Sequence, residues 1–466
     1  MRLPIKKPTY IFLIFAVILG ADTRGDSRLI TYDKAKPLPS NALVENWIRF
    51  NGPYDNATTK DTSIALDKNK FKIKKIWELS KGEGYASPAI FNNHLILFHL
   101  QNGFEIIESR DAETGKIRWS HKYPAEYRDR YGYSNGPRAS PLIWDGCVYA
   151  HGVTAWLTCL ELETGKLLWE RDLKKEFLIP DYFFGKGSNP IVSANSLILN
   201  IGGQKNDCVA GFDLKNGKTL WITKDAWGAS YSSPVKAKIN GRDTCIFFTG
   251  GESRPPTGGL LILDSETGQK LARFPWRSKM YESANASPPV VVSQNRIFIS
   301  ECYEKGGVLV EFDENFSPKI IWHKPELNVH WMTPIYHEGL IFGVSGRHQR
   351  GAAVFCVEAK TGLIRWKERV SWKDTINDQV LNLELFRGSI LKINDYYLAL
   401  SEIGSLILLN MDENGWNLLG KQQLFFAPGT WTLPALSNGL LYVMQNEKDR
   451  MSGMEPRVLC FDLRKP

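Results

Sequence analysis

Short runs of β-branched, aromatic and leucine residues recur eight times along the chain, and each run is bounded by turn-forming residues. Their centres fall about 49 residues apart, and each run has the length and composition of a buried β-strand. This spacing predicts one β unit repeated eight times rather than several unrelated domains. The runs are His94–Phe98, Cys147–Ala150, Ser196–Leu199, Cys245–Phe248, Arg296–Ile299, Leu340–Gly343, Tyr396–Ala399 and Leu440–Val443.

Each run is preceded by a small residue followed by proline, as in Ser87-Pro88, or by a degenerate form of that step. Asn or Asp stands in most of the intervening turns, often before glycine, as in Asp145-Gly146. Such turns are typical of tight hairpins. The sequence therefore predicts a short first strand that pairs with each run.

A third strand then ends in an acidic residue, and a glycine turn leads to a fourth strand with tryptophan. The pattern is clear in four units, for example Glu161, Gly165 and Trp169, and it decays in the others. Glycine supplies the positive φ of the turn, and tryptophan on an outer strand has the area to bridge neighbouring sheets. We predict this docking role for Trp77, Trp119, Trp169, Trp221, Trp322 and Trp366.

Four short strands in each of eight units predict an all-β fold, an eight-bladed β-propeller of four-stranded blades. The last unit ends at Val458–Asp462 without a fourth strand, whereas an orphan strand with Trp77 lies at residues 71–79. We expect this N-terminal strand to complete the last blade and close the ring. The chain then divides into a signal peptide (1–21), a lead segment (22–70) and the propeller (71–466).

These repeats resemble the pyrroloquinoline-quinone (PQQ) type propeller repeat, so the chain is similar to the superfamily of BamB-like and quinoprotein propellers. The lead sequence Asn46–Pro53 is similar to the Trp-x-x-Phe-Arg-Gly-Pro opening of secreted bacterial members, although Asn51 stands where arginine is usual. The resemblance implies the propeller fold. For function it implies either a quinone-dependent dehydrogenase or a scaffold like the outer-membrane-assembly lipoprotein.

The distribution of charge bears on the partners of the protein, and the N-terminal sequence bears on its location. The formal net charge is +8, from 58 Lys and Arg against 50 Asp and Glu, and the basic residues are scattered, so a nucleic-acid partner is not indicated. A basic start, an apolar run at Tyr10–Leu19 and small Gly20-Ala21 are typical of a secretory signal peptide. We expect a periplasmic or secreted monomer with no membrane span after signal removal; the alternative is that the N-terminal segment stays uncleaved as an anchor.

Seven cysteines without a CxxC motif or a vicinal pair exclude a disulfide scaffold. Most are expected to be buried thiols. Cys147 and Cys159 flank a predicted hairpin whose turn lies near Val153. They form either a cross-strand disulfide or two packed thiols, and the sequence leaves both alternatives open.

Patterns for catalysis and metal binding are absent from the sequence. It has no HExxH motif, no phosphate-binding glycine loop and no calcium loop of closely spaced Asp, Asn and Glu. A quinoprotein dehydrogenase, as the resemblance implies, needs calcium held by carboxylate and amide oxygens, and many have a vicinal disulfide. We predict no catalytic residue, no metal site and no cofactor, with PQQ and calcium only under the alternative.

The segments that lead into the first strands are rich in polar and aromatic residues, and in a propeller they converge at one mouth of the central channel. For the seventh unit this segment is Asn382–Glu384. We predict a site there for an anionic or sugar-like ligand; the other interpretation is that these groups only satisfy crowded backbone atoms. The candidates are Arg138, Asn189, Ser232, Asn285, Trp331 and Trp431.

The sequence thus favours an exported, non-catalytic propeller that binds a small-molecule ligand or a protein as a scaffold. The alternative is a PQQ-dependent oxidoreductase that uses the channel mouth. A third interpretation is a structural partner in an envelope assembly, similar to the assembly lipoprotein, although no cysteine near the predicted cleavage region is placed to carry a lipid.

Overall fold

The structure is a computed structural model that describes residues 26–66, 71–251 and 256–465. The predicted signal peptide at 1–21 lies outside the described residues. Within those ranges the secondary structure is β apart from one short helix, α1 (Leu173–Glu176). No described helix has the length and apolar character that a membrane crossing requires.

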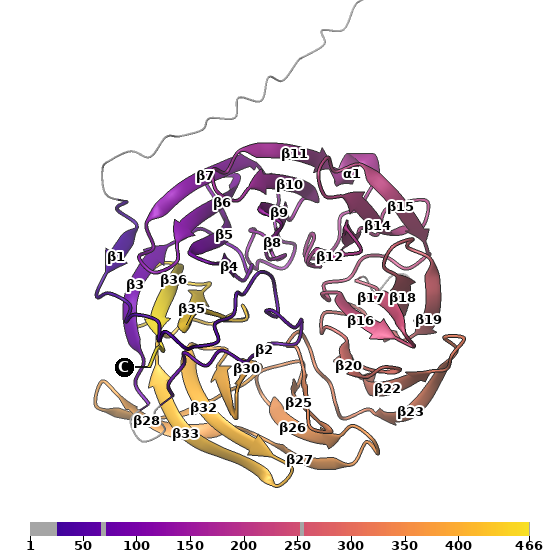
Figure 1. Ribbon diagram of the computed structural model, residues 1–466. Coiled ribbons are helices and arrows are strands. Elements are labelled where there is room, and N and C mark those ends of the chain that lie inside the picture. The colour runs from indigo at the N-terminus through magenta and orange to yellow at the C-terminus, as the bar shows by residue number, and fades with distance from the viewer. Residues whose placement is uncertain (1–25, 67–70, 252–255, 466) are drawn as a thin grey trace, which may run out of the picture.

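Eight antiparallel sheets of four strands stand in a ring around a central axis (Figure 1). The innermost strand of each blade has only three to five residues, because the blades crowd together near the axis. The second strands are almost entirely buried, since both of their faces are covered by neighbouring blades, and this explains their continuous apolar runs. The predicted eight-bladed propeller of four-stranded blades is confirmed.

From the axis outward, blade one is β4 (Ala89–Phe91), β5 (His94–Gln101), β6 (Phe104–Asp111) and β7 (Ile117–Pro124); blade two is β8 (Leu142–Trp144), β9 (Cys147–His151), β10 (Trp156–Glu161) and β11 (Leu167–Asp172). Blade three is β12 (Ile191–Ser193), β13 (Ser196–Asn200), β14 (Asp207–Asp213) and β15 (Thr219–Lys224); blade four is β16 (Val235–Ile239), β17 (Arg242–Thr249), β18 (Gly259–Asp264) and β19 (Lys270–Pro275).

In the same direction, blade five is β20 (Val290–Ser293), β21 (Arg296–Glu301), β22 (Gly306–Phe312) and β23 (Pro318–Lys324); blade six is β24 (Ile335–His337), β25 (Leu340–Ser345), β26 (Ala353–Glu358) and β27 (Ile364–Glu368). Blade seven is β30 (Ser389–Ile393), β31 (Tyr396–Leu400), β32 (Ser405–Asp412) and β33 (Gly415–Gln423). Blade eight is β34 (Ala435–Ser437), β35 (Leu440–Gln445), β36 (Arg457–Asp462) and β3 (Lys74–Ser80).

Ring closure by the N-terminal strand is confirmed. Strand β3 is antiparallel to β36, with Trp77 opposite Cys460, and so supplies the fourth strand of blade eight. The lead segment adds two further strands: β1 (Leu29–Thr31) pairs with the outer edge of β3, and β2 (Thr58–Thr59) pairs in parallel with β30. The two ends of the chain are therefore joined in one sheet.

Among the described residues, five outer-strand tryptophans connect their blade to the next through their indole N–H groups. Nε1 of Trp77, Trp119 and Trp169 donates to the carbonyl of Ala112, Leu162 and Leu214 at 3.3, 2.7 and 3.1 Å. The Nε1 atoms of Trp322 and Trp366 do the same to the carbonyls of Ala359 and Asp412, each at 2.8 Å. Because Trp77 comes from the closing strand, its bond joins blade eight to blade one.

The turn glycine of the next blade lies against the indole ring. At Gly165 the φ angle is +72°, and a Cβ atom there would stand 2.5 Å from the ring of Trp119. Gly217 has the same relation to Trp169. Glycine is thus required twice, for the backbone conformation and for the contact.

Trp221 departs from this pattern. Its ring lies between Gly211 of its own blade and Gly268 of the next, but its Nε1 atom has no hydrogen-bond partner among the described residues. Trp221 is only half-buried. This blade contact therefore depends on ring packing alone.

A plug formed by residues 45–53 of the lead segment crosses the centre of the ring, where Figure 1 shows the indigo chain running toward β2. The plug is bonded to the innermost strands: the N–H of Ile90 donates to the carbonyl of Trp47, and the N–H of Ile143 to that of Ile48, each at 2.8 Å. On the other side of the ring, the Thr333 hydroxyl donates to Asn51 Oδ1 at 2.8 Å. The lead segment is therefore part of the fold, and it closes the channel.

One element of the structure lies outside the predicted repeat. Strands β28 (Ser371–Ile376) and β29 (Gln379–Glu384) form a separate two-stranded hairpin, which comes between blades six and seven in the sequence. Figure 1 shows β28 at the rim beside β33. The prediction that Asn382–Glu384 leads into the first strand of the seventh blade is wrong, because these residues belong to β29. The lead into β30 is the short stretch 385–388.

The cysteines are free thiols, including Cys147 and Cys159. The predicted hairpin between these two residues is present, but Cys159 lies opposite Tyr149 and Cys147 opposite Glu161. The two thiols are thus diagonal neighbours on one face of the sheet. The structure contains the second of the two alternatives, packed thiols.

A carboxyl group is buried between blades one and two, and no described residue forms an ion pair with it. Glu105 on β6 is fully buried, and its Oε1 accepts a hydrogen bond from the N–H of Val153 at 2.9 Å. Its Oε2 has no hydrogen-bond partner among the described residues. Burial raises the pKa of Glu105 from its usual 4.5 to about 7, because the charged form is poorly solvated there.

Replacing a docking tryptophan is expected to destabilise the ring strongly. Trp169→Ala and Trp366→Ala each leave a cavity between blades and remove a hydrogen bond, so each lowers the free energy of unfolding by ~3–5 kcal/mol. Urea denaturation measures this loss, and Trp144→Ala, at a tryptophan that is 37% exposed, is the control. A loss below ~1 kcal/mol at both docking sites contradicts the bridging role.

The buried acid predicts a pH dependence of stability. Since the pKa of Glu105 is higher in the folded chain than the usual 4.5, its contribution is full below about pH 4.5 and is lost as the pH rises through about 7. Relative to Glu105→Gln, the wild type loses about 3 kcal/mol of unfolding free energy between pH 4 and pH 9. If the difference in unfolding free energy between the two proteins stays constant from pH 4 to pH 9, the pKa of Glu105 is not raised.

Candidate functional site

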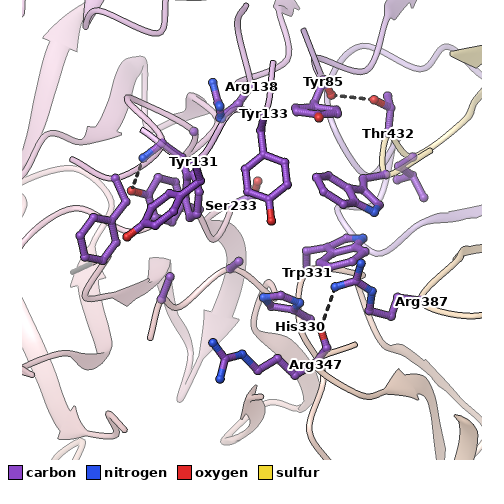
Figure 2. A pocket seen from close by; sticks show the side chains of 18 of the residues that line it. Tyr85, Tyr131, Tyr133, Arg138, Ser233, His330, Trp331, Arg347, Arg387 and Thr432 are labelled. Atoms are coloured by element: carbon purple, nitrogen blue, oxygen red, sulfur yellow. Dashed lines mark hydrogen bonds between the residues drawn. The ribbon is translucent and has the colours of Figure 1, made fainter. Parts of the chain in front are cut away.

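The segments before the innermost strands surround a cavity of about 330 Å³ at one mouth of the channel. Its walls come from loops of nearly every blade, and Phe50 of the plug is part of its lining. The plug therefore makes this mouth a cup rather than the entrance of an open channel. Figure 2 shows aromatic side chains turned toward one space, with arginines at its edges.

Aromatic rings form a nearly continuous collar around the cup. On one side Tyr85 and Trp331 each lie near Trp431, with ring centroids 5.3 and 5.2 Å apart. Tyr133 then bridges the two sides, at 5.3 Å from Trp431 and 6.0 Å from Phe184. The other side consists of Tyr131, Phe183, Phe184 and Tyr231.

Two of the three arginines of the cup are held from behind by buried carboxylates. Arg138 Nη2 donates to Asp129 Oδ2 at 2.7 Å, and the Arg138 guanidinium lies 5.9 Å from the Tyr85 ring centroid. Arg387 is paired with Glu402, and its guanidinium lies 4.4 Å from the Trp331 ring centroid. These ion pairs fix the planes of both guanidinium groups.

The third arginine is less constrained. Arg347 lies over the Tyr303 ring at 4.9 Å and faces Glu282 across 3.8 Å, with 31% of its side chain exposed. Glu282 is the one carboxylate in the lining of the cup, against the cations of Arg138, Arg347 and Arg387. The cup thus combines apolar faces with an excess of positive charge.

The cup contains polar atoms that have no partner within the described chain. His330 Nε2 lies 3.1 Å from the Tyr303 hydroxyl, but His330 Nδ1 and Trp331 Nε1 are buried without hydrogen bonds to other described residues. Burial and the nearby Arg387 and Arg347 lower the pKa of His330 to about 3. The imidazole is therefore neutral at neutral pH, and it offers hydrogen bonds rather than charge.

Four of the six candidate residues line the cup: Arg138, Asn189, Trp331 and Trp431. Among these, the Asn189 amide is already engaged between blades with the Ser140 N–H and the Ser233 hydroxyl. Its polar atoms therefore join innermost strands, in agreement with the structural interpretation of such groups.

Ser232 and Asn285 are not in the lining of the cup, and for them the placement predicted from the sequence is wrong. The Ser232 hydroxyl donates to the Ser287 carbonyl at 3.0 Å, and the Asn285 amide donates to the Thr249 carbonyl at 2.6 Å. Their neighbours Ser233, Ala284 and Ala286 face the cup instead. Successive residues of an extended strand point to opposite sides, so a shift of one position reverses the placement.

Several lining residues were not among the candidates. Arg347 follows β25, Tyr303 follows β21, and Arg387 precedes β30, so the repeat pattern does not mark them. The signal available in the sequence was the density of aromatic residues in two loops, Tyr131-Gly-Tyr133 and Phe183-Phe184.

The residues present do not fit the calcium ion that the PQQ-dependent alternative calls for. Calcium needs several carboxylate and amide oxygens. The cup offers only the Glu282 carboxylate, which faces Arg347, and the Asn189 amide, which is already bonded. No group of three or more His, Cys, Asp or Glu that is able to hold a metal occurs among the described residues.

Comparison with known proteins places the chain among propellers of two functional kinds. The profile of a family described as outer membrane protein assembly factor BamB matches residues 103–368. The protein of that name from Moranella endobia (strain PCIT) is 32% identical over 208 residues, which cover 35% of this chain and 50% of the relative.

The dehydrogenase subunit of alcohol dehydrogenase (quinone) from Gluconacetobacter polyoxogenes is 23% identical over 229 residues. That match covers 45% of this chain and only 30% of the relative's own length. The crystal structure of BamB from Moraxella catarrhalis superposes with a TM-score of 0.54 at 14% identity, covering 84% of this chain and 98% of the other. The structural likeness shows the fold alone.

Proposed function

Since this chain belongs to the family described as outer membrane protein assembly factor BamB, we propose that it works as an exported, non-catalytic propeller that binds a partner protein in the mouth cup. The observation that carries the proposal is the aromatic collar with its three arginines. Tyrosine, tryptophan and arginine are the residues that dominate the energetics of protein interfaces. Periplasmic or secreted placement is part of the same proposal.

The cup is better suited to binding than to turnover. Its one carboxylate faces an arginine, and its buried histidine has a pKa of about 3. A general base works best when its pKa is near the working pH, so a group with so low a value accepts a proton poorly. The arginines of the cup act instead as fixed hydrogen-bond donors to an anionic group of the partner.

The closed channel adds to this argument. Because the plug occupies the axis beneath the cup, a bound group enters and leaves through the same mouth. The partner therefore inserts a side chain or a loop into the cup from outside.

The second candidate function is that of a quinone-dependent oxidoreductase. The alignment with alcohol dehydrogenase (quinone) subunits favours it. Against it stands the donor set of the cup, which lacks the oxygen ligands for calcium. Only the oxidoreductase function requires PQQ and calcium, so one assay on the purified protein separates the two functions.

We expect a photoreactive phenylalanine analogue at position 133 to cross-link a partner protein in the cells that produce this chain. Tyr133 is at the rim of the cup and is 44% exposed, and the matched control is the same analogue at Leu220, 51% exposed on β15. Trp331→Ala and Arg138→Ala, placed in the chain with the analogue at 133, should abolish the cross-link.

Equal cross-linking at positions 133 and 220 contradicts the proposal. The alternative is tested on the purified protein supplied with PQQ and calcium. Reduction of a dye with an alcohol or sugar, lost in Trp331→Ala, establishes the oxidoreductase and overturns the non-catalytic function.

A further inference from the structure

A second cavity of about 340 Å³ lies beside the cup. It is built from the loop at 126–130, the turn at 153–155, Lys174 of α1 and the segment 179–186 that follows this helix. The ring of Phe183 belongs to the lining of both cavities, and so forms a shared wall. The two cavities are therefore neighbouring parts of one surface.

The second cavity differs from the cup in chemistry. Its lining contains Arg128, Arg130, Lys174 and Lys186 against the carboxylates of Glu126 and Asp181. Lys174 pairs with Asp181 at 2.5 Å, and Lys186 is buried with its Nζ donating to the Ile201 carbonyl at 2.9 Å. This lining carries a net positive charge.

Two cations of this cavity are available to a ligand. Arg128 and Arg130 are exposed, and neither forms an ion pair with another described residue. The guanidinium of Arg130 lies 5.3 Å from the Phe183 ring centroid, at the wall between the cavities. The positive charge of Arg130 therefore lies next to the Phe183 end of the aromatic collar.

We propose that the two cavities form one bipartite site for an extended acidic peptide segment of the partner protein. An aromatic side chain of the segment enters the cup, and its acidic residues lie over Arg128 and Arg130. This inference rests on the proposed function, in which the cup binds a protein, and it names the chemistry of the segment that is bound.

The distances limit the spacing of the two features in the peptide. The steps from Arg130 to Phe183, from Phe183 to Phe184 and from Phe184 to Tyr133 are 5.3, 6.3 and 6.0 Å. An extended chain advances ~3.3–3.6 Å per residue, so up to about five residues separate the aromatic residue from the acidic ones.

The test uses fluorescein-labelled twelve-residue peptides and the full mature chain, with binding measured by fluorescence anisotropy. One peptide has a phenylalanine three residues before a run of three acidic residues. In the others the phenylalanine is alanine, the acidic residues are serine, or the acidic residues are lysine. We expect only the first to bind tightly, with an affinity that falls as the salt concentration rises.

Variants at exposed positions separate binding from folding. Tyr133→Ala and the double variant Arg128→Glu with Arg130→Glu should each weaken binding of the first peptide by at least about tenfold. Arg242→Glu is the matched control, because Arg242 is an exposed arginine at the start of β17, next to the Asn240-Gly241 hairpin turn rather than in either cavity. Its affinity should equal that of the wild type.

The outcomes distinguish this inference from the proposed function. If the serine peptide binds as tightly as the acidic one, the acidic half of the site is wrong, while binding in the cup stands. If polygalacturonate binds with the same sensitivity to Tyr133→Ala and no peptide does, the ligand is an acidic polysaccharide and the inference is overturned. The first result leaves a cross-link at position 133 as evidence for a protein partner. The second result contradicts that interpretation of the cross-link.

Discussion

The contact between a tryptophan of one blade and the turn glycine of the next is the interaction on which the structure depends. A single four-stranded blade leaves two apolar faces open to water, and it becomes stable only when neighbours cover both. The indole ring fixes the distance between blades, and its N–H group fixes their orientation, as in Trp119 against Gly165 and the Leu162 carbonyl. The same contact made by Trp77 from the N-terminal strand joins the last blade to the first.

Closure of the ring determines where side chains from different blades meet to form a site. Each blade presents the lead into its innermost strand at one mouth, so side chains from eight distant parts of the sequence meet there. The rigid ring holds them, and the plug closes the channel beneath them through bonds to Ile90, Ile143 and Thr333. The result is a one-sided cup in which arginines and aromatic rings are fixed before any partner arrives, which lowers the entropy lost on binding.

The repeat explains how much of the fold and of the cup could be predicted from the sequence. The strands and the hairpin turns depend on local sequence and recur in every blade, and the glycine–tryptophan pattern recurs in several, so a unit in which the pattern has decayed is recognised from the others. The closing strand is marked by the same residue type, Trp77. The cup depends on loops, which do not repeat. The sequence predicts Ser232 at the cavity where Ser233 faces it, and Asn285 where Ala284 and Ala286 do, because the direction of a side chain alternates with each residue and the sequence does not define the exact start of the strand. Arg347 and Arg387 lie outside the repeat pattern, and only the folded chain brings Arg347 to Tyr303 and Arg387 to Trp331.

The central claim is that the cup and the cavity beside it are the binding surface of this protein. Hydrogen–deuterium exchange with and without the aromatic and acidic peptide tests it most directly, because exchange reports on every blade in one experiment. The account predicts slower exchange confined to the mouth loops, at residues 126–138, 177–187, 330–334 and 346–348. Slower exchange at the hairpin turns of the opposite mouth or along the outermost strands, with the mouth loops unchanged, would contradict it.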